Sequence, residues 1–479
     1  MFFVDVIEMK GLGNRSHLAG GPDSAVAVDP PRDIDRVVAA AARRGVRIAY
    51  VAETHVHNDY VTGGLELARV TGAGYLVPER APVSFARTPV ADGDVFEVDR
   101  GLVLRAVATP GHTPHHTAYV LEEHGHGAAV FTGGSLLMGT VGRPDLVEPR
   151  LTERLAREQH ASARRLADGL DDAVEVLPTH GFGSFCSAVP ADSESSTIGA
   201  ERERNDALRK DVDTFVSETL SGLDDVPAYY AHMGPVNAAG PAPVDLTPPQ
   251  EADAGQIRAR LADGEWVVDL RSRVAFAEGH VPGTYNFEYE GKLATYLAWL
   301  IPWGKPVTLL GESRGQVADA QRELARVGID RPVAAGAGGP YDWLRQGEKP
   351  GSFERGSFAD LAAVRAEAEA DAEADAGATG GADPAAAGDQ PVVLDVRRDT
   401  ERAEGFIDGS VHIPVHQLHG RTGEVPSGVV WVHCGSGMRA AMGASLLAAS
   451  GRTVVLVDDR FDAAPGAGLT MAVPGRDGR

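Results

Sequence analysis

The sequence predicts an α/β protein, with an N-terminal metal-binding domain followed by two small parallel α/β domains. Three observations lead to this prediction: histidines follow several short apolar runs in the first half, a strand pattern occurs twice in the second half, and 479 residues exceed what one hydrophobic core usually supports. We expect the domains to span residues 1–240, 250–352 and 354–479.

The first domain is predicted to hold a metal ion on loops that leave its strands. The apolar runs that read as buried strands are Arg47–Ala52, Leu102–Ala108 and Val174–Leu177. The candidate ligands that follow these runs are His55, His57, Asp59, His112 and His180. Imidazole and carboxylate groups are ligands for Zn²⁺ and Fe²⁺, and loops at strand ends can bring several of them to one point.

The second half of the chain contains an internal repeat. Trp266–Arg271 and Val392–Arg397 both read as buried strands that end in Asp-x-Arg, and in each copy a glycine follows the aspartate ten residues on. A second apolar run and a helix-like segment come next in both copies. Strands that alternate with helices at this spacing predict a small parallel α/β domain, present twice.

A cysteine-bearing loop in the second copy is predicted to be a second chemical centre. Cys434 follows the apolar run Val429–Val432 and precedes the helical stretch Ala440–Ala449. A glycine-rich loop at a helix N-terminus directs N–H groups inward as an anion nest, and Arg439 with the helix end is expected to lower the thiol pKa. We therefore predict Cys434 and Arg439 as catalytic residues. The loop residues expected to bind the substrate are Gly435, Ser436, Gly437 and Met438.

Two segments are predicted to lie outside the compact domains. Five prolines, the first of them Pro235, punctuate a connector up to residue 249 that is not expected to continue a helix. This places the first boundary at 240–250. Residues 366–390 are an acidic low-complexity insertion after a short leading helix, Phe358–Arg365, and we assign the insertion no chemistry.

Residues 1–240 resemble the metallo-β-lactamase superfamily. The pattern behind this resemblance is His-x-His-x-Asp at residues 55–59, with the later motifs Gly111–Thr113 and Thr179–Gly181. Within the superfamily the likeness is to persulfide dioxygenases, on the motifs Glu53–His57, Thr109–Thr113, Thr132–Gly134 and Val141–Leu146. The resemblance implies an αββα sandwich for this domain.

The repeated half resembles rhodanese domains, which are sulfurtransferases, on its Asp-x-Arg strands and the loop Cys434–Ala440. The resemblance implies that Cys434 takes up a sulfane sulfur as a persulfide and passes it to a nucleophile such as sulfite. Arg439 and the loop amides would stabilise the outer sulfur. The first copy reads Leu310–Gly315 at the matching place and has no thiol, so we expect a catalytically silent spacer or docking domain.

The resemblance also implies a metal and its ligands. In persulfide dioxygenases a single Fe²⁺ is held by two histidines and one aspartate, and two of those positions match His55 and His112. The aspartate of the family's Thr-Gly-Asp motif is replaced by Gly134, which supplies no ligand. Tyr60 stands where dinuclear relatives carry a histidine, so we expect a single metal ion.

Three arrangements of that metal stay open. In the first, His55 and His112 bind Fe²⁺, and Asp59, His57 or a water replaces the missing carboxylate. In the second, His55, His57 and His112 bind Zn²⁺ together with a water. In the third, the site binds metal weakly. A second metal ion would have little beyond Asp59 and His180.

The function implied by both resemblances is a pathway in sulfur metabolism. The first domain would oxidise a low-molecular-weight thiol persulfide with O₂ to sulfite, and the rhodanese domain would transfer sulfur to sulfite to give thiosulfate. One alternative is a Zn²⁺-dependent thioester hydrolase of the glyoxalase II type, fused to a sulfurtransferase. Another is a non-catalytic persulfide-binding or sulfur-relay protein in which only the rhodanese is active.

Other residues near these motifs are assigned lesser roles. Arg143 and Asp145 are expected to pair and shape the pocket wall. For His115 and His116 we favour a structural role over a place at the border of the pocket. For Cys186, shortly after the third histidine loop, two interpretations stay open: contact with a substrate persulfide, or buried packing.

Composition limits the partners and the location. The formal net charge of −23 disfavours nucleic acid and anionic membranes as partners, and no apolar run is long enough to span a bilayer. Only two cysteines occur, which excludes a disulfide framework. The segment Met1–Glu8 lacks the features of a secretory signal, so we expect a cytoplasmic protein. Association into a homo-oligomer is compatible with the sequence.

Overall fold

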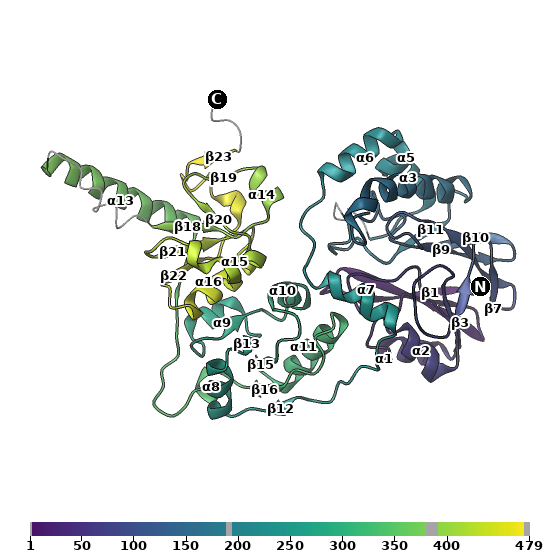
Figure 1. The fold of residues 1–479 in the computed structure, drawn as a ribbon, viewed down its shortest axis with the longest axis horizontal. Coiled ribbons are helices and arrows are strands. Elements are labelled where there is room, and N and C mark those ends of the chain that lie inside the picture. The colour runs from purple at the N-terminus through teal and green to yellow at the C-terminus, as the bar shows by residue number, and fades with distance from the viewer. Residues whose placement is uncertain (1, 188–193, 380–390, 474–479) are drawn as a thin grey trace. The chain divides into compact units, whose positions relative to one another are not determined.

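The chain forms two compact units. The computed structural model describes residues 2–187, 194–379 and 391–473. One unit comprises Met1–Asp245 and Arg322–Asp330, and the other comprises Leu246–Gln321 and Arg331–Arg479. Figure 1 shows the elements of both units. The boundaries predicted for three domains stay a prediction.

Two sheets and seven helices of the described residues make up most of the N-terminal unit. The first sheet has six strands in chain order, β1 (Phe3–Met9), β2 (Asn14–Gly20), β3 (Ser24–Val28), β4 (Arg47–Ala52), β5 (Gly74–Pro78) and β6 (Thr88–Val90). The second has the order β11 (Glu175–Pro178), β10 (His126–Gly133), β9 (Thr117–Glu123), β8 (Leu102–Ala108) and β7 (Val95–Asp99). The helices are α1 (Asp35–Arg44), α2 (Gly64–Thr71), α3 (Thr152–Asp168), α4 (Ile198–Arg204), α5 (Asp206–Arg209), α6 (Val212–Ser221) and α7 (Tyr230–Ala239).

The core of this unit lies between the two sheets. Val26 and Ala52 of the first sheet pack in one buried cluster with Leu104 and Phe131 of the second. A further apolar cluster joins the outer face of the first sheet to α1 and α2, and another joins the outer face of the second sheet to α3. Helices thus cover both outer faces (Figure 1), and the predicted αββα sandwich is confirmed.

Strand direction brings the loops of the second sheet to one edge. β8 and β10 are both antiparallel to β9, and β11 is parallel to β10, so β8, β10 and β11 point the same way. The loops that follow these three strands therefore leave the same edge of the sheet. These loops carry His112, Gly134 and His180.

Two parallel five-stranded sheets with matching strand orders form the centre of the C-terminal unit. The first has the order β12 (Gln250–Glu251), β16 (Ala334–Ala337), β15 (Val307–Gly311), β13 (Trp266–Asp269) and β14 (Tyr285–Asn286). The second has the order β17 (Glu354–Gly356), β22 (Val454–Val457), β21 (Val430–His433), β18 (Val392–Asp395) and β20 (Val411–His412). A short extra pair is β19 (Phe406–Ile407) with β23 (Met471–Ala472). The helices are α8 (Ala254–Ala262), α9 (Arg273–Glu278), α10 (Leu293–Leu300), α11 (Arg314–Arg326), α12 (Pro340–Trp343), α13 (Phe358–Thr379), α14 (Asp399–Ala403), α15 (Val415–Arg421) and α16 (Met438–Ala449).

The repeated Asp-x-Arg motif has the same physical role in both copies. Arg271 Nη2 donates to Asp269 Oδ2 at 2.6 Å and to the carbonyl oxygen of Gly279 at 2.8 Å. In the second copy Arg397 Nη2 donates to Asp395 Oδ2 and to the carbonyl oxygen of the glycine at 405, both at 2.8 Å. A buried charge pair is tolerated only when its hydrogen bonds are satisfied. The glycine ten residues after the aspartate supplies the second acceptor, which explains the repeated spacing.

The structure corrects one expectation and extends another. Pro235 lies inside α7, although the proline-rich segment was expected to exclude a helix. A proline costs a helix one N–H hydrogen bond, and α7 is anchored by a buried side chain, Asn237, described below. Helix α13 continues beyond the expected Phe358–Arg365 to Thr379, into the acidic insertion. Residues 380–390 of that insertion lie outside the described residues.

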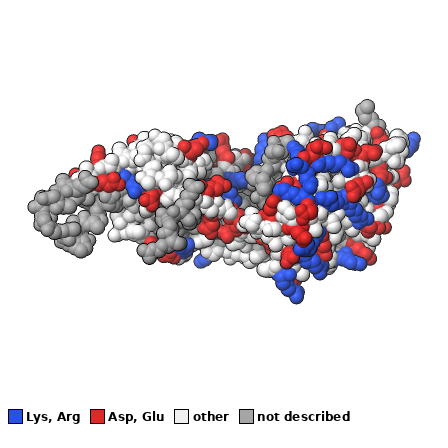
Figure 2. Space-filling model, turned by 90° about the horizontal axis from the view of Figure 1, so that it is seen from above, with Lys and Arg blue, Asp and Glu red and all other residues white. Residues whose placement is uncertain are grey.

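Over the part of the chain that the structure describes, every helix is too short or too polar to cross a bilayer. Figure 2 shows one face of the molecule, on which basic side chains are interspersed with acidic ones. Mixed charges of this kind are typical of a solvated surface.

Candidate metal centre and sulfur-transfer loop

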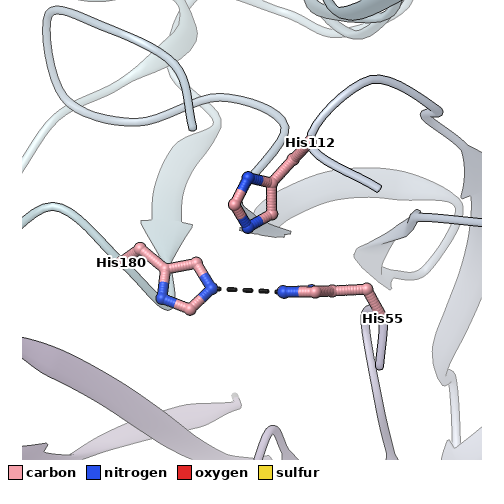
Figure 3. Close-up of side chains that lie close together, drawn as sticks. All are labelled: His55, His112 and His180. Carbon is pink, nitrogen blue, oxygen red and sulfur yellow. Dashed lines mark hydrogen bonds between the residues drawn. The ribbon is translucent and has the colours of Figure 1, made fainter. Parts of the chain in front are cut away.

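Three buried histidines from different loops of the N-terminal unit converge on one point. His55 follows β4, His112 follows β8 and His180 follows β11, and each is at most 1% exposed. Their ligand nitrogens lie within 4.8 Å of one another. Figure 3 shows the three rings facing one another, with His55 Nε2 and His180 Nε2 3.3 Å apart.

The surroundings of His55 determine which of its nitrogens carries the proton. His55 Nδ1 lies 2.8 Å from Thr54 Oγ1, and the Thr54 hydroxyl donates to Asp29 Oδ2 at 2.7 Å. Burial alone would raise the pKa of Asp29, but its contacts with His57 hold that pKa below the usual range, so Asp29 is an acceptor. The Thr54 oxygen therefore accepts from His55 Nδ1–H, and the lone pair of His55 lies on Nε2.

The same reasoning applies to the other two rings. His112 Nδ1 lies 2.8 Å from the carbonyl oxygen of Arg143, which can only accept. His180 Nδ1 lies 3.1 Å from Asn14 Oδ1, and the amide nitrogen of Asn14 donates to Asp59 Oδ2 at 2.7 Å. Three Nε2 lone pairs thus point into one buried space, where they repel one another unless a cation or a proton lies between them. Histidines that bind a metal usually donate their other ring N–H to an acceptor, which fixes the orientation of the ring. These three residues have that arrangement, so they fit a metal ion.

His57 and Asp59 lie beside this cluster in different roles. His57 Nε2 is 3.2 Å from both Asp29 Oδ1 and Glu53 Oε2. Burial lowers the pKa of His57, but the two carboxylates outweigh it and raise this pKa to about 10. His57 Nδ1 and Asp59 Oδ1 have no hydrogen-bond partner among the described residues. Both offer ligand atoms within 4.8 Å of His180, and Asp59 Oδ2 lies 3.2 Å from His180 Nδ1, the ring nitrogen that does not face His55.

The structure brings all five predicted ligands together in two overlapping groups. One group is His55, His112 and His180, and the other is His57, Asp59 and His180. The sequence interpretation set Asp59 and His180 apart as what remains of a second metal position, and the second group contains both of them. In the first group the third side chain is an imidazole and not a carboxylate.

Gly134 lacks a ligand and also lacks space for one. A Cβ at this position would lie 2.6 Å from His112 Cγ, closer than real Cβ contacts allow, so the ring of His112 lies over the glycine. The N–H of Gly134 donates to His116 Nε2 at 3.0 Å, and Gln159 Nε2 donates to its carbonyl oxygen at 2.9 Å. The Tyr60 hydroxyl donates to the carbonyl oxygen of Asp29 at 3.1 Å, so we assign Tyr60 no role as a metal ligand.

His116 borders the centre as a brace. Its ring stacks on His55 with 4.9 Å between the ring centroids, and its Nδ1 lies 2.8 Å from Thr109 Oγ1. Both ring nitrogens of His116 have hydrogen-bond partners, and the ring holds the Gly134 backbone against the metal loops. His116 therefore has the expected structural role, and it lies at the border of the site.

Cys186 is both buried and close to the metal centre. The expected pair of Arg143 and Asp145 is confirmed, with Nε–Oδ1 at 2.7 Å, and the Arg143 backbone N–H donates to the carbonyl oxygen of Cys186. Cys186 Sγ lies 3.7 Å from Tyr230 Oη. Burial and the neighbouring Asp59 raise the pKa of the Cys186 thiol. The sulfur is 3.7 Å from a phenol and adjacent to a candidate ligand, which is compatible with either role predicted for it.

Asn237 is a positioning residue that sequence reasoning missed. It lies on α7, is 3% exposed, and donates from Nδ2 to the carbonyl oxygens of His57 and Tyr60, both at 2.8 Å. Its Oδ1 accepts from the Thr62 N–H at 3.0 Å. One side chain thus fixes three backbone groups of the first histidine loop. The proline-rich segment around it gave no signal of this role.

We expect Asn237→Ala to loosen this loop. The change leaves two buried carbonyl oxygens and one N–H without partners, at about 1–3 kcal/mol for each unsatisfied group. Metal affinity is expected to fall about ten- to a hundredfold, as for other groups that orient ligands. Equilibrium metal titration and thermal unfolding of the two variants Asn237→Ala and Asn237→Asp check this. Asn237→Asp keeps the size and the acceptor for the Thr62 N–H but has no N–H for the two carbonyl oxygens, so it should lose affinity as well; wild-type affinity in both variants would contradict the assignment.

The Cys434 loop joins β21 to α16 in the C-terminal unit. The thiol is 1% exposed, and the Ser436 N–H donates to Cys434 Sγ at 3.5 Å. Gly437 has φ 89°, a conformation that favours glycine, and a Cβ there would lie 3.1 Å from Arg273 Nε. Arg439 is engaged by a carboxylate: its Nη2 donates to Glu401 Oε1 at 2.7 Å, in a two-pronged contact that also uses Nη1.

Comparison with known proteins agrees with both halves of this description. A family model described as "Rhodanese-like domain" matches residues 253–346 and 382–463. The mitochondrial persulfide dioxygenase ETHE1 of Homo sapiens is 27% identical over 247 residues, covering 50% of this chain and 84% of that protein. A hydroxyacylglutathione hydrolase of Polaromonas sp. is 26% identical over 248 residues, covering 45% of this chain and 88% of that protein. A crystal structure of a metallo-beta-lactamase from Staphylococcus aureus aligns with a TM-score of 0.63 and 25% identity, covering 70% of this chain and 99% of that one.

The chain therefore combines an N-terminal metallo-β-lactamase fold with C-terminal rhodanese-like domains, and ETHE1-type persulfide dioxygenases are among its relatives. The predicted fold and the predicted resemblance are confirmed.

Proposed function

We propose that the N-terminal unit is an iron-dependent persulfide dioxygenase. It would convert a low-molecular-weight thiol persulfide, O₂ and water into the thiol, sulfite and two protons. The observation that carries the proposal is the convergence of the Nε2 atoms of His55, His112 and His180 in a buried space. A bound Fe²⁺ would supply adjacent open positions at which O₂ and the persulfide sulfur can meet.

The residues of the chain have distinct parts in this proposal. His55, His112 and His180 hold the ion. Asp59 and His57 lie beside it, where they can complete the coordination or hold a proton near the substrate. The similarity to persulfide dioxygenases and the attached rhodanese-like domains favour a persulfide as substrate.

The C-terminal unit would act as a sulfurtransferase through Cys434. The thiolate takes the outer sulfur of a donor and becomes a persulfide. The sulfur lone pair of sulfite then attacks that outer sulfur, the bond to Cys434 Sγ breaks, and its electron pair returns to the thiolate. The product is thiosulfate. Glu401 holds Arg439 beside the loop, so Arg439 would support the loop as well as the bound sulfur.

A Zn²⁺-dependent thioester hydrolase is the second candidate. Three imidazoles are a common catalytic Zn²⁺ ligand set, and a hydroxyacylglutathione hydrolase is among the relatives. A relay protein without oxidation chemistry is the third outcome. For all three we expect the cytoplasm as the location, since reduced thiols persist there.

Metal analysis together with substrate turnover separates these functions. The full chain, purified without oxygen, is analysed for iron and zinc and then given glutathione persulfide or a glutathione thioester. Iron with oxygen uptake and sulfite release supports the dioxygenase. Zinc with thioester hydrolysis overturns the dioxygenase in favour of the hydrolase. If both activities are absent, the result supports the relay protein.

A further inference from the structure

A short stretch of the copy without a thiol belongs to the compact unit that holds the metal centre. Residues Arg322–Asp330 group with Met1–Asp245, although they lie inside the range 253–346 that matches the rhodanese-like family. They comprise the last part of α11 and the turn that follows it. Helix α11 is the counterpart of α16, since the two helices follow the matching strands β15 and β21. The helix that follows the thiol loop in one copy therefore ends inside the metal-binding unit in the other.

Two ion pairs hold this stretch in the N-terminal unit. Arg326 donates from Nε to Asp33 Oδ1 at 2.8 Å and from Nη2 to Asp33 Oδ2 at 2.7 Å. Arg32 donates from Nη2 to Asp330 Oδ2 and from Nη1 to the carbonyl oxygen of Ala325, both at 2.9 Å. Arg326, Asp33 and Arg32 are each at most 6% exposed. A two-pronged contact between arginine and carboxylate fixes orientation as well as distance, so the end of α11 has one defined place in this unit.

The end of α11 contacts the first histidine loop, residues 53–63, directly. The Val61 N–H donates to the carbonyl oxygen of Arg326 at 2.7 Å. Val61 is fully buried and lies two residues after Asp59, on the loop that also carries His55. The carbonyl oxygens of the last helical turn have no partner within their own helix. The last carbonyl of α11 is therefore available to hold the loop, and it does so.

The turn Pro30–Asp33 binds both α11 and the loop. Its arginine and its aspartate make the contacts with α11 described above. Its second proline forms an isolated β-bridge with Thr62, and the carbonyl oxygen of its first proline accepts from the Gly63 N–H at 3.1 Å. A shift of the α11 end would therefore move the loop in two ways, directly through Val61 and indirectly through this turn.

We propose that the copy without a thiol serves the metal centre through α11, in which Arg326 is a positioning residue for the first histidine loop. The side chain of Arg326 is fixed on Asp33, and its carbonyl oxygen then holds Val61. The inference goes beyond the proposed function, because it concerns the place of the loop and applies whether the centre binds Fe²⁺ or Zn²⁺. It also gives this copy a task that needs no thiol.

The first test measures Co²⁺ binding to the metal-free full chain by absorbance. Arg326→Met removes the two-pronged contact, so Co²⁺ affinity should fall about tenfold, the lower end of the range for groups that orient metal ligands. Arg326→Lys keeps the charge but cannot make a two-pronged contact, so its loss should be smaller. Arg314→Met is the matched control, because Arg314 is exposed on the same helix and pairs with Glu251 at the surface. It should bind Co²⁺ like the wild type.

Hydrogen exchange of the same chains without metal shows where the contact acts. In Arg326→Met, exchange should become faster in peptides that cover residues 30–33 and 53–63. Peptides from β9 and β10 in the second sheet should keep the wild-type rate. A merely structural role would instead speed up exchange throughout the N-terminal unit.

The outcomes are separable. Wild-type Co²⁺ affinity in Arg326→Met overturns the inference, as does an equal loss of affinity in Arg314→Met or faster exchange throughout the unit. If Arg326→Met does not fold, Arg326→Lys decides: wild-type affinity overturns the inference, and a loss of affinity with faster exchange confined to residues 30–33 and 53–63 supports it. If the wild-type chain binds no Co²⁺, the metal centre itself fails, and the inference with it.

Discussion

Replacing His180 with alanine is expected to remove the bound metal and to lower oxygen uptake with glutathione persulfide by at least about a hundredfold. The reason is that His180 Nε2 lies 3.3 Å from His55 Nε2 and faces the same buried space as His112. Without its ring, only two of the three converging imidazoles remain, and Gly134 offers no replacement. Metal content by elemental analysis and oxygen uptake by electrode are measured on the same preparation.

His126→Ala is the matched control for this prediction. His126 is exposed at the start of β10, so its loss should leave both metal and uptake at the wild-type level. Wild-type metal content in the His180→Ala chain would contradict the assignment, because the carboxylate of Asp59 or the ring of His57 would then bind the metal in place of His180.

Replacing Cys434 with serine is expected to abolish sulfur transfer to sulfite while oxygen uptake continues. A serine hydroxyl is a far weaker nucleophile than a thiolate and cannot carry a sulfane sulfur. Oxygen uptake should persist because its ligands belong to the other compact unit. Transfer is followed by thiosulfate formation from a persulfide donor and sulfite.

Cys186→Ser provides the comparison, since it alters the other cysteine and should leave sulfur transfer intact. If the Cys434→Ser chain transfers sulfur at the wild-type rate, the rhodanese-like loop is not the transfer site. If both activities disappear together, the two centres depend on each other more than the separate units indicate.

Much of the fold could be predicted because its signals are local. Short apolar runs mark the strands, and the Asp-x-Arg motif with its later glycine marks both copies of the repeat, since Arg271 and Arg397 each need that glycine's carbonyl oxygen. Helix α7 was missed because Pro235 is a strong local signal against a helix. Tertiary anchoring by Asn237 outweighs that local preference.

The candidate site was predictable in its ligand types and only partly in its geometry. Spacing shows that histidines follow strands, but it does not show which ring nitrogen faces which partner. The placement of His180 depends on Asn14, which is remote in sequence and holds its Nδ1. The filling of the Gly134 position by the His112 ring is likewise a property of packing, and the sequence shows only that a carboxylate is missing.

The two halves of the chain use different electrostatics for related sulfur chemistry. In the N-terminal centre burial lowers the pKa of His55 and of His112, the latter to about 3, which keeps their lone pairs available at physiological pH. The Cys434 loop carries Arg439, which Glu401 holds in a two-pronged contact. In the proposed function the first centre produces sulfite and the second consumes it.

Diffraction from crystals of the full chain, recorded on both sides of the iron absorption edge, tests the central claim most directly. The claim predicts a single anomalous peak within bonding distance of the Nε2 atoms of His55, His112 and His180. A chain that binds no metal at that point, or binds it between Asp29, Glu53 and His57 instead, would contradict it.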